Sequence, residues 1–219
     1  MAGEIAIRGW GSLLWTGDFT TPDDENRQRE FDRWHAEWRS DGPSLTIEFS
    51  RISVTRNGAL TLVIDAGNPV PAQVSWCMSS RGKISDAVED LRKREGMTNC
   101  KRIGRYPQGR WQPQPEKAGA FKGICDWARS RGLSAVWTDL ESNFWQQIER
   151  GKLPPDVRLS SGQLQQMRGQ PFDQAAIAYL QALTDHAKTK AFEYILRAPS
   201  FVRTPLRREF ERRLTDRGL

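Results

Sequence analysis

The feature that most constrains the fold is a pair of β-rich runs joined by Asn57-Gly58 in the stretch LTIEFSRISVTRNGALTLVID. Asn and Gly both accept positive φ, so this pair favours a tight turn between antiparallel strands. Leu45, Ile47 and Phe49 alternate onto one face of the first run. Continued alternation would bring Arg51 onto that apolar face, so either a bulge re-aims the strand or the arginine enters the interior. A buried arginine needs a partner, which is a ligand carboxylate in one interpretation and a local acid such as Glu48 in the other.

Further strands and helices follow a mixed pattern. Strands are expected at residues 4–9, 74–79 and 133–140, and the pattern predicts helices within 18–41, at 84–95 and at 121–131. Residues 105–118 are rich in Pro, Gln and Gly and are predicted to form a loop. The last third shows helical stripes at 172–183 and 187–195, followed by a basic tail. Early strands and late helices predict an α+β fold, with helices packed on a largely antiparallel, curved sheet.

Composition excludes several classes of protein. No apolar run is long enough for a transmembrane helix, and the N-terminus does not resemble a secretory signal. The three cysteines form no CxxC pair, which favours reduced thiols, a cytoplasmic location and no metal site. Two distant histidines offer no catalytic triad or ligand motif. Chemistry is therefore expected to rest on a carboxylate or on backbone groups, and the chain has no P-loop, Rossmann fingerprint or zinc motif to indicate a cofactor.

The charge distribution permits an acidic partner without requiring one. The net charge is +6, and much of the excess lies in residues 92–110 and in the tail from Arg203 to Arg217. The tail intersperses its arginines with Glu209, Glu211 and Asp216, as a solvated helix face does. Docking of an acidic protein is the alternative. Nucleic acid is not an expected partner, because the tail lacks a pattern of aromatic residues on which bases stack.

Gly96 is predicted to cap the C-terminus of the helix expected at 84–95, and Glu95, just before it, occupies an unusual position. It stands seven residues after Val88 and four after Leu91, so it lies on the same side as the apolar stripe. It also falls in the last turn, where the helix dipole disfavours an anion. Both burial and the dipole would raise its pKa and suit it to general acid–base chemistry. The alternative is an ion pair with Arg92, Arg94 or Arg102.

Two motifs together resemble the gamma-glutamylcyclotransferase family. They are Gly11, Ser12 and Leu13 in GWGSLLW, after the first strand, and Glu95 with Gly96 in LRKREGM, at the end of a helix. The resemblance covers roughly residues 4–140. It implies a mixed, barrel-like sheet with packed helices in a core of residues 1–145, and it leaves residues 146–219 as a helical C-terminal extension packed on the same domain.

The resemblance also implies an activity. Members of the family release 5-oxoproline from gamma-glutamyl amides or peptides, a reaction of the amidine-lyase or acyltransferase type. Glu95 would be the general acid/base, while Gly9, Trp10, Gly11, Ser12 and Leu13 would form a backbone cradle for the substrate, and Arg51 would bind its carboxylate. Basic residues near Arg102 and Arg105 would hold a second carboxylate.

One position departs from the family, and it leaves a second function open. The family commonly has a tyrosine where this chain has Trp10, so the hydroxyl is lost. The alternative function is a non-catalytic binding protein that uses the same pocket and its basic tail to recognise a peptide or an acidic partner.

Overall fold

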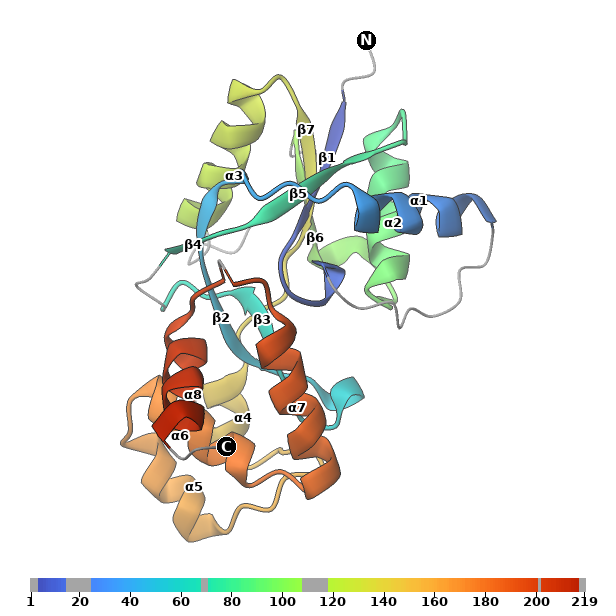
Figure 1. Ribbon diagram of the computed structural model, residues 1–219. Helices are drawn as coiled ribbons and strands as arrows, with labels where there is room; N and C mark the ends of the chain where they lie inside the picture. Colours follow the sequence, from blue (N-terminus) through green and yellow to red (C-terminus); the bar gives the residue numbers. More distant parts are fainter. Residues whose placement is uncertain (1–3, 15–24, 68–70, 108–117, 201, 217–219) are drawn as a thin grey trace. The chain divides into compact units, whose positions relative to one another are not determined.

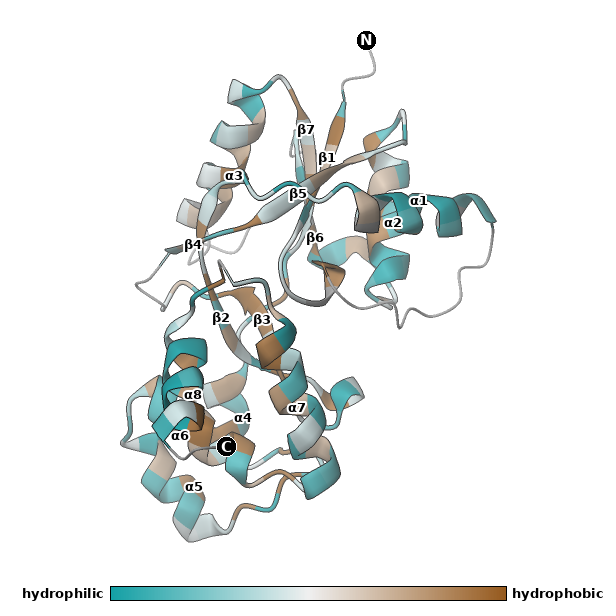
Figure 2. Cartoon of the chain, viewed as in Figure 1, coloured by the Kyte–Doolittle hydropathy of each residue, from teal (hydrophilic) through white to brown (hydrophobic). Residues whose placement is uncertain are grey.

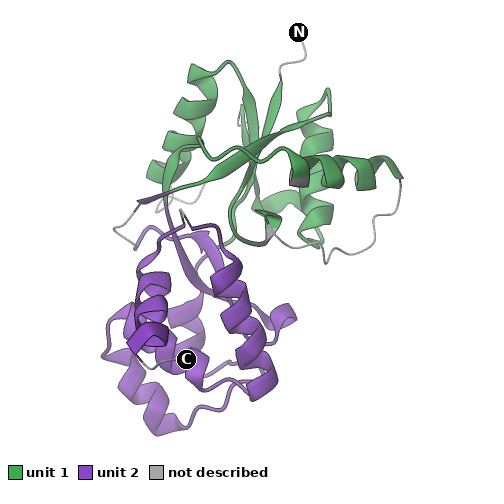
Figure 3. Cartoon of the chain, viewed as in Figure 1, with its two compact units in different colours: residues 1–45, 73–140 green, residues 46–72, 141–219 purple. Residues whose placement is uncertain are grey.

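The computed structural model describes residues 4–14, 25–67, 71–107, 118–200 and 202–216. The chain divides into two units, one formed by residues 1–45 and 73–140 and the other by residues 46–72 and 141–219 (Figure 3). The second unit therefore joins the Asn57-Gly58 hairpin to the C-terminal helices. The predicted core of residues 1–145 had grouped this hairpin with the N-terminal strands.

Unit 1 is built on a four-stranded sheet in the order β5-β1-β7-β6. Its strands are β1 (Ile5–Gly9), β5 (Ser75–Ser79), β6 (Ile103–Tyr106) and β7 (Ser134–Thr138). β1 runs parallel to β7 and antiparallel to β5, and β6 runs antiparallel to β7. The strands predicted at 4–9, 74–79 and 133–140 are confirmed. The predicted loop at 105–118 is wrong at Arg105 and Tyr106, which lie in β6, and residues 108–117 lie outside the described residues.

Helices cover both faces of this sheet (Figure 1). They are α1 (Glu25–Ala36), α2 (Ile84–Arg94) and α3 (Ala118–Ser130). Ile5 and Ile7 of β1 belong to a hydrophobic cluster with residues of α1 and α2, whereas the intervening Ala6 packs in a second cluster with Trp76, Leu133 and Trp127 of α3. This alternation follows from the two-residue period of a strand.

Unit 2 combines a small sheet with five helices among its described residues. The sheet has the order β3-β2-β4, with strands β2 (Ser44–Ile52), β3 (Leu60–Ile64) and β4 (Pro71–Gln73), of which Ser44, Leu45 and Gln73 belong to unit 1. The helices are α4 (Phe144–Arg150), α5 (Ser161–Arg168), α6 (Phe172–Gln181), α7 (Asp185–Arg197) and α8 (Pro205–Asp216). In Figure 2, β3 is mainly hydrophobic, whereas α8 is mainly hydrophilic.

The predicted hairpin is confirmed, and it includes a bulge. β2 and β3 pair antiparallel, with a register shift between Glu48 and Arg51. A short 3-10 turn at Val54–Arg56 precedes Asn57 and Gly58, whose φ values of 52° and 84° are both positive. The bulge resolves the conflict in the alternation pattern, because Arg51 is only half buried and donates to the carbonyl of Glu141 at 3.0 Å.

The fold class is α+β, as predicted. The single curved, barrel-like sheet is not what the described residues form: they make two sheets, and neither closes into a barrel. A barrel needs hydrogen bonds between its first and last strands, and here the sheets end at β5 and β6 and at β3 and β4. Within the described ranges, no helix has both the length and the apolarity needed to span a membrane.

Candidate functional site

The turn after β1 has a local structural reason for each of its two glycines. A Cβ on Gly9 would lie 2.4 Å from the indole of Trp38, so only glycine allows this close packing. Gly11 has a φ of 72°, a left-handed conformation that residues with a side chain rarely adopt. The chain then forms a 3-10 turn at Gly11–Leu14. The described backbone therefore changes direction sharply at the predicted cradle.

Side chains of the turn are directed largely into the protein. Trp10 is 5% exposed and Leu13 is 3% exposed. Leu13 belongs to the same hydrophobic cluster as Val88 and Leu91 of α2, and Met97 packs against that cluster. The turn and the end of α2 thus share one core within unit 1. The side chain of Ser12 lies outside what the structure describes.

The end of α2 has a well-defined geometry. Gly96 adopts a φ of 63°, its N–H donates to the Lys93 carbonyl at 3.0 Å, and the N–H of Met97 donates to the Arg92 carbonyl at 3.0 Å. These two bonds form a Schellman motif, which confirms the prediction of Gly96 as the C-terminal cap. Glu95 is the last residue before this glycine and is partly buried. Its position is therefore fixed by the cap and by the packing of α2.

Strand directions place the turn after β1 and the end of α2 at the same edge of the sheet, the one at which β1 and β7 have their carboxyl ends. Ile5 lies opposite Ser79 and Gly9 lies opposite Ser75, so the chain leaves β5 beside the start of β1. α2 follows shortly after and packs on β1, β6 and β7. An 11-residue helix and a five-residue strand are both about 16 Å long, so a helix running back along the sheet ends near the end of β1. Figure 1 shows α2 running along β1 in this way.

Basic groups of β6 and the segment before it are also near this edge. Ile103 pairs with Thr138, so β6 begins beside the carboxyl end of β7. The Arg102 carbonyl accepts from the Asp139 N–H at 2.7 Å. Arg105 lies opposite Val136, on the face covered by α2, and its buried Nε has no hydrogen-bond partner among the described residues. Arg105 is thus a half-buried cation with spare donor capacity.

Arg92 has partners within its own helix and the following turn. It forms an ion pair with Glu89 at 2.6 Å, and it donates to the Met97 carbonyl. The hydrogen bonds that Arg92 donates to Glu89, together with the positive charge of Arg92, lower the pKa of Glu89. Arg92 therefore helps to fasten the turn that follows Glu95.

Arg51 belongs to unit 2, whereas the other predicted site residues belong to unit 1. Its neighbours in the bulge are held by polar side chains from the segment before α4. Ser142 Oγ donates to the Ser50 carbonyl at 3.0 Å, and the Asn143 amide bonds both the N–H and the carbonyl of Ile52. Ser142 and Asn143 thus fasten the bulged strand.

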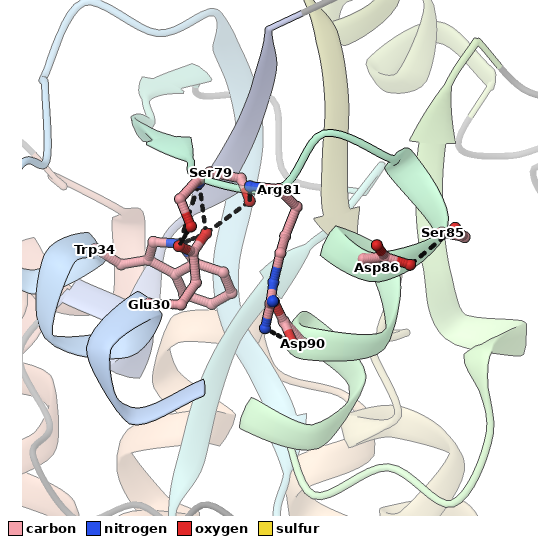
Figure 4. A network of polar contacts seen from close by, with 8 residues as sticks. Glu30, Trp34, Ser79, Arg81, Ser85, Asp86 and Asp90 are labelled. Atoms are coloured by element: carbon pink, nitrogen blue, oxygen red, sulfur yellow. Dashed lines mark hydrogen bonds and ion pairs between the residues drawn. The ribbon is translucent and has the colours of Figure 1, made fainter. Parts of the chain in front are cut away.

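A buried carboxylate that the sequence analysis missed lies in α1. Glu30 is 2% exposed and accepts hydrogen bonds from Trp34 Nε1, Ser79 Oγ and both the N–H and the Oγ of Ser80 (Figure 4). Burial raises the pKa of Glu30, but the hydrogen bonds from Ser79, Ser80 and Trp34 outweigh it and leave the pKa below its ordinary value. The signal was available, because Glu30 stands four residues before Trp34 on the apolar face of the helix.

The Glu30 network fastens α1 to β5, and a neighbouring ion pair fastens the next turn to α2. The Arg81 N–H donates to Ser79 Oγ, and the Arg81 guanidinium binds the buried carboxylate of Asp90 at 2.5 Å (Figure 4). A carboxylate whose acceptor sites are filled by fixed donors, as in Glu30, is a stable anion and a poor proton acceptor. These groups are anchors of the fold.

No protein-family model matches the chain, and no curated protein or solved structure matches it either.

Proposed function

We propose that the chain is a cyclotransferase-like enzyme, with Glu95 as general acid/base and the backbone of Gly9–Leu13 as the substrate cradle. The observation that supports the proposal most is that the turn after β1 and the end of α2 share one hydrophobic core at one edge of the sheet. The order of elements, a strand and glycine turn followed later by a helix that ends in Glu-Gly, is the one that the family resemblance requires. We extend the proposal to the fold, in which this order of elements is the feature that the chain would share with the family.

The reaction is an intramolecular aminolysis. The α-amine of a gamma-glutamyl group attacks its γ-carbonyl carbon, so that a new C–N bond closes a five-membered ring and the original amide C–N bond breaks. The attacking nitrogen loses two protons in all, one before it attacks and one as the ring closes. Glu95 passes each in turn to the departing nitrogen, which leaves as a protonated amine. Backbone N–H groups of the turn stabilise the negative charge that develops on the carbonyl oxygen. The products are 5-oxoproline and a free amine.

Substrate choice follows from the basic groups near this edge. Arg105, a half-buried cation of β6, suits the second carboxylate of a gamma-glutamyl peptide. A gamma-glutamyl amine has no such carboxylate and would gain nothing from it. The three cysteines are free thiols, which fits our proposal that the enzyme acts in the cytoplasm.

The direct test incubates the pure protein with gamma-glutamyl dipeptides and gamma-glutamyl amines and measures 5-oxoproline. We expect turnover of at least one compound and a loss of about 10²- to 10⁴-fold in kcat for Glu95→Gln, the range for removal of a general acid/base. Glu193→Gln is the matched control, since Glu193 is an exposed helical glutamate of unit 2. It should retain full activity.

Folding must be separated from catalysis in this test. Circular dichroism and the urea midpoint of Glu95→Gln should equal those of the unmodified protein within error. Absence of product across the whole panel from folded protein would contradict the proposal and favour the non-catalytic binding protein. Turnover that survives Glu95→Gln would assign the reaction to other residues.

A further inference from the structure

Unit 2 contains a cavity of about 430 Å³ between α5 and the C-terminal half of α6. This volume lies in the range of about 300–1,000 Å³ that is typical of small-molecule sites. Its apolar lining includes Leu159, Met167, Ala178 and Leu183, of which Met167 and Leu183 are buried. The cavity thus has a hydrophobic floor large enough for a short aliphatic group.

The walls of this cavity are held by defined contacts. Val157 and Leu183 form an antiparallel bridge, and the N–H of Arg158 donates to the Ala182 carbonyl at 2.8 Å. Ser160 and Gln163 form a capping box at the start of α5, in which Gln163 Oε1 accepts from the N–H and the Oγ of Ser160 at 2.9 Å. A site with fixed walls loses little entropy when it binds a ligand.

The polar lining selects for a particular chemistry. Arg158 is the only charged residue among the described residues that line the cavity, and none of the described acids forms an ion pair with it. The amides of Gln163, Gln166, Gln170 and Gln181 add neutral polar groups and no negative charge. Among the described lining residues, a ligand carboxylate would therefore meet one cation and no anion.

We propose that this cavity binds a small organic carboxylate that carries a short branched aliphatic group. Arg158 binds the carboxylate, and the aliphatic group rests on Met167 and Leu183. The site is separate from the proposed cyclotransferase residues and does not depend on their activity.

N-acetyl-L-leucine is the probe, and isothermal titration calorimetry measures its binding to the full chain. At about 0.3 kcal/mol per non-hydrogen atom, a ligand of this size has a dissociation constant of the order of 1 mM. N-acetyl-L-leucinamide, which lacks the carboxylate, should bind about tenfold more weakly. Acetate, which lacks the aliphatic group, should also bind more weakly.

Two variants assign the contacts. Arg158→Gln should weaken N-acetyl-L-leucine about tenfold and leave the leucinamide unchanged. Leu159→Ala removes part of the apolar lining and should weaken both leucyl probes alike. Arg197→Gln is the matched control, because Arg197 is an exposed arginine of unit 2 outside the cavity lining, and it should bind as the unmodified protein does.

Thermal melting shows which variants are folded before binding is compared. The proposal is overturned if folded, unmodified protein shows no binding heat at 10-fold the expected dissociation constant, about 10 mM. It is equally overturned if the leucinamide binds as tightly as N-acetyl-L-leucine, or if Arg158→Gln binds all three probes unchanged.

Discussion

Arg8 is a fully buried arginine, although arginine side chains usually lie at the protein surface. Its side chain is fully buried in β1, with the guanidinium 4.1 Å from the ring centre of Trp127. None of its three guanidinium nitrogens has a hydrogen-bond partner among the described residues. Burial and the nearby charge of Arg131 lower the pKa of Arg8 well below its ordinary value, and Asp41 acts in the opposite direction. The stacked indole is the contact that compensates for lost hydration.

Glu48 gives the clearest prediction at the scale of one residue. Its carboxylate is buried, accepts from the Phe49 N–H at 2.7 Å and from the Leu206 N–H at 3.1 Å, and is also bonded by Thr204. It thus caps the start of α8, so pairing with Arg51 is not its role. Desolvation dominates over these hydrogen bonds and raises the pKa of Glu48 from 4.5 to about 7.

The raised pKa predicts a stability that falls as pH rises. The folded state binds the Glu48 proton more tightly than the unfolded state, so its stabilising contribution is complete below about pH 4.5 and is lost as pH rises through about 7. The expected loss between pH 5 and pH 8 is about 3 kcal/mol. Urea unfolding at a series of pH values measures it, and Glu48→Gln should remove this part of the slope. An identical slope in the variant would contradict the assignment.

At the scale of the element, the helices depend on what holds their ends. α1 is fastened to β5 through Glu30, α8 begins on Glu48, and α5 begins with the capping box of Ser160. The arginines of α8 pair along the helix: Arg207 with Glu211, and Arg212 with Glu209 and Asp216. The exposed pairs of Arg212 agree with the interpretation of the basic tail as a solvated helix face, and such pairs add little stability. Arg207 differs, because it is 7% exposed and its Nη1 donates to the Ala198 carbonyl at 2.6 Å.

The end of α2 provides the prediction at this scale. Gly96→Ala should lower the free energy of unfolding by about 1 kcal/mol, because alanine resists the left-handed conformation that the Schellman motif requires. Apart from its two chain neighbours, no described residue has an atom within 4 Å of the position that its Cβ would take, so the cost comes from the backbone. Urea denaturation measures the change.

Gly82→Ala is the matched control for this prediction. Gly82 is also exposed with open space around its Cβ position, but it does not have a positive φ. Its replacement should change stability by less than about 0.5 kcal/mol. Equal effects of the two substitutions would argue against the backbone explanation.

At the scale of the whole molecule, each of the two units has its own core. The core of unit 2 includes contacts between Phe144 and both Phe172 and Tyr179, with ring centres 5.3 and 5.6 Å apart. Tyr179 also donates to the Gly58 carbonyl at 2.8 Å, so α6 fastens the turn of the hairpin. The hairpin therefore depends on helices that follow it by more than 80 residues.

A chain that ends at residue 140 tests this dependence. It keeps β2 and β3 but loses groups that hold them, including the side chains of Asn143 and Tyr179 and the backbone N–H of Leu206. Phe49 and the other buried residues of the hairpin would be exposed, so we expect binding of the dye ANS, aggregation and loss of cooperative unfolding. Cooperative unfolding without ANS binding would instead show that residues 1–140 fold on their own.

Local sequence patterns predicted most of the helices, strands and turns, because these elements are stabilised mainly by residues close together in the chain. The Asn57-Gly58 turn, the Gly96 cap and the apolar stripe of α2 each depend on residues a few positions apart, and each is present in the structure. β6 and β4 have no such signal, since both are short and their sequences are rich in residues that also suit loops. Their strand character comes from pairing with distant partners.

The sequence by itself determined the α+β class and the main helices and strands. Tertiary structure alone decided that the strands form two open sheets, that the hairpin joins the C-terminal helices, and that Glu30 and Glu48 are buried carboxylates with opposite pKa shifts. The physical reason is that strand pairing and desolvation depend on groups far apart in the chain, whereas turns and helical faces depend on neighbours.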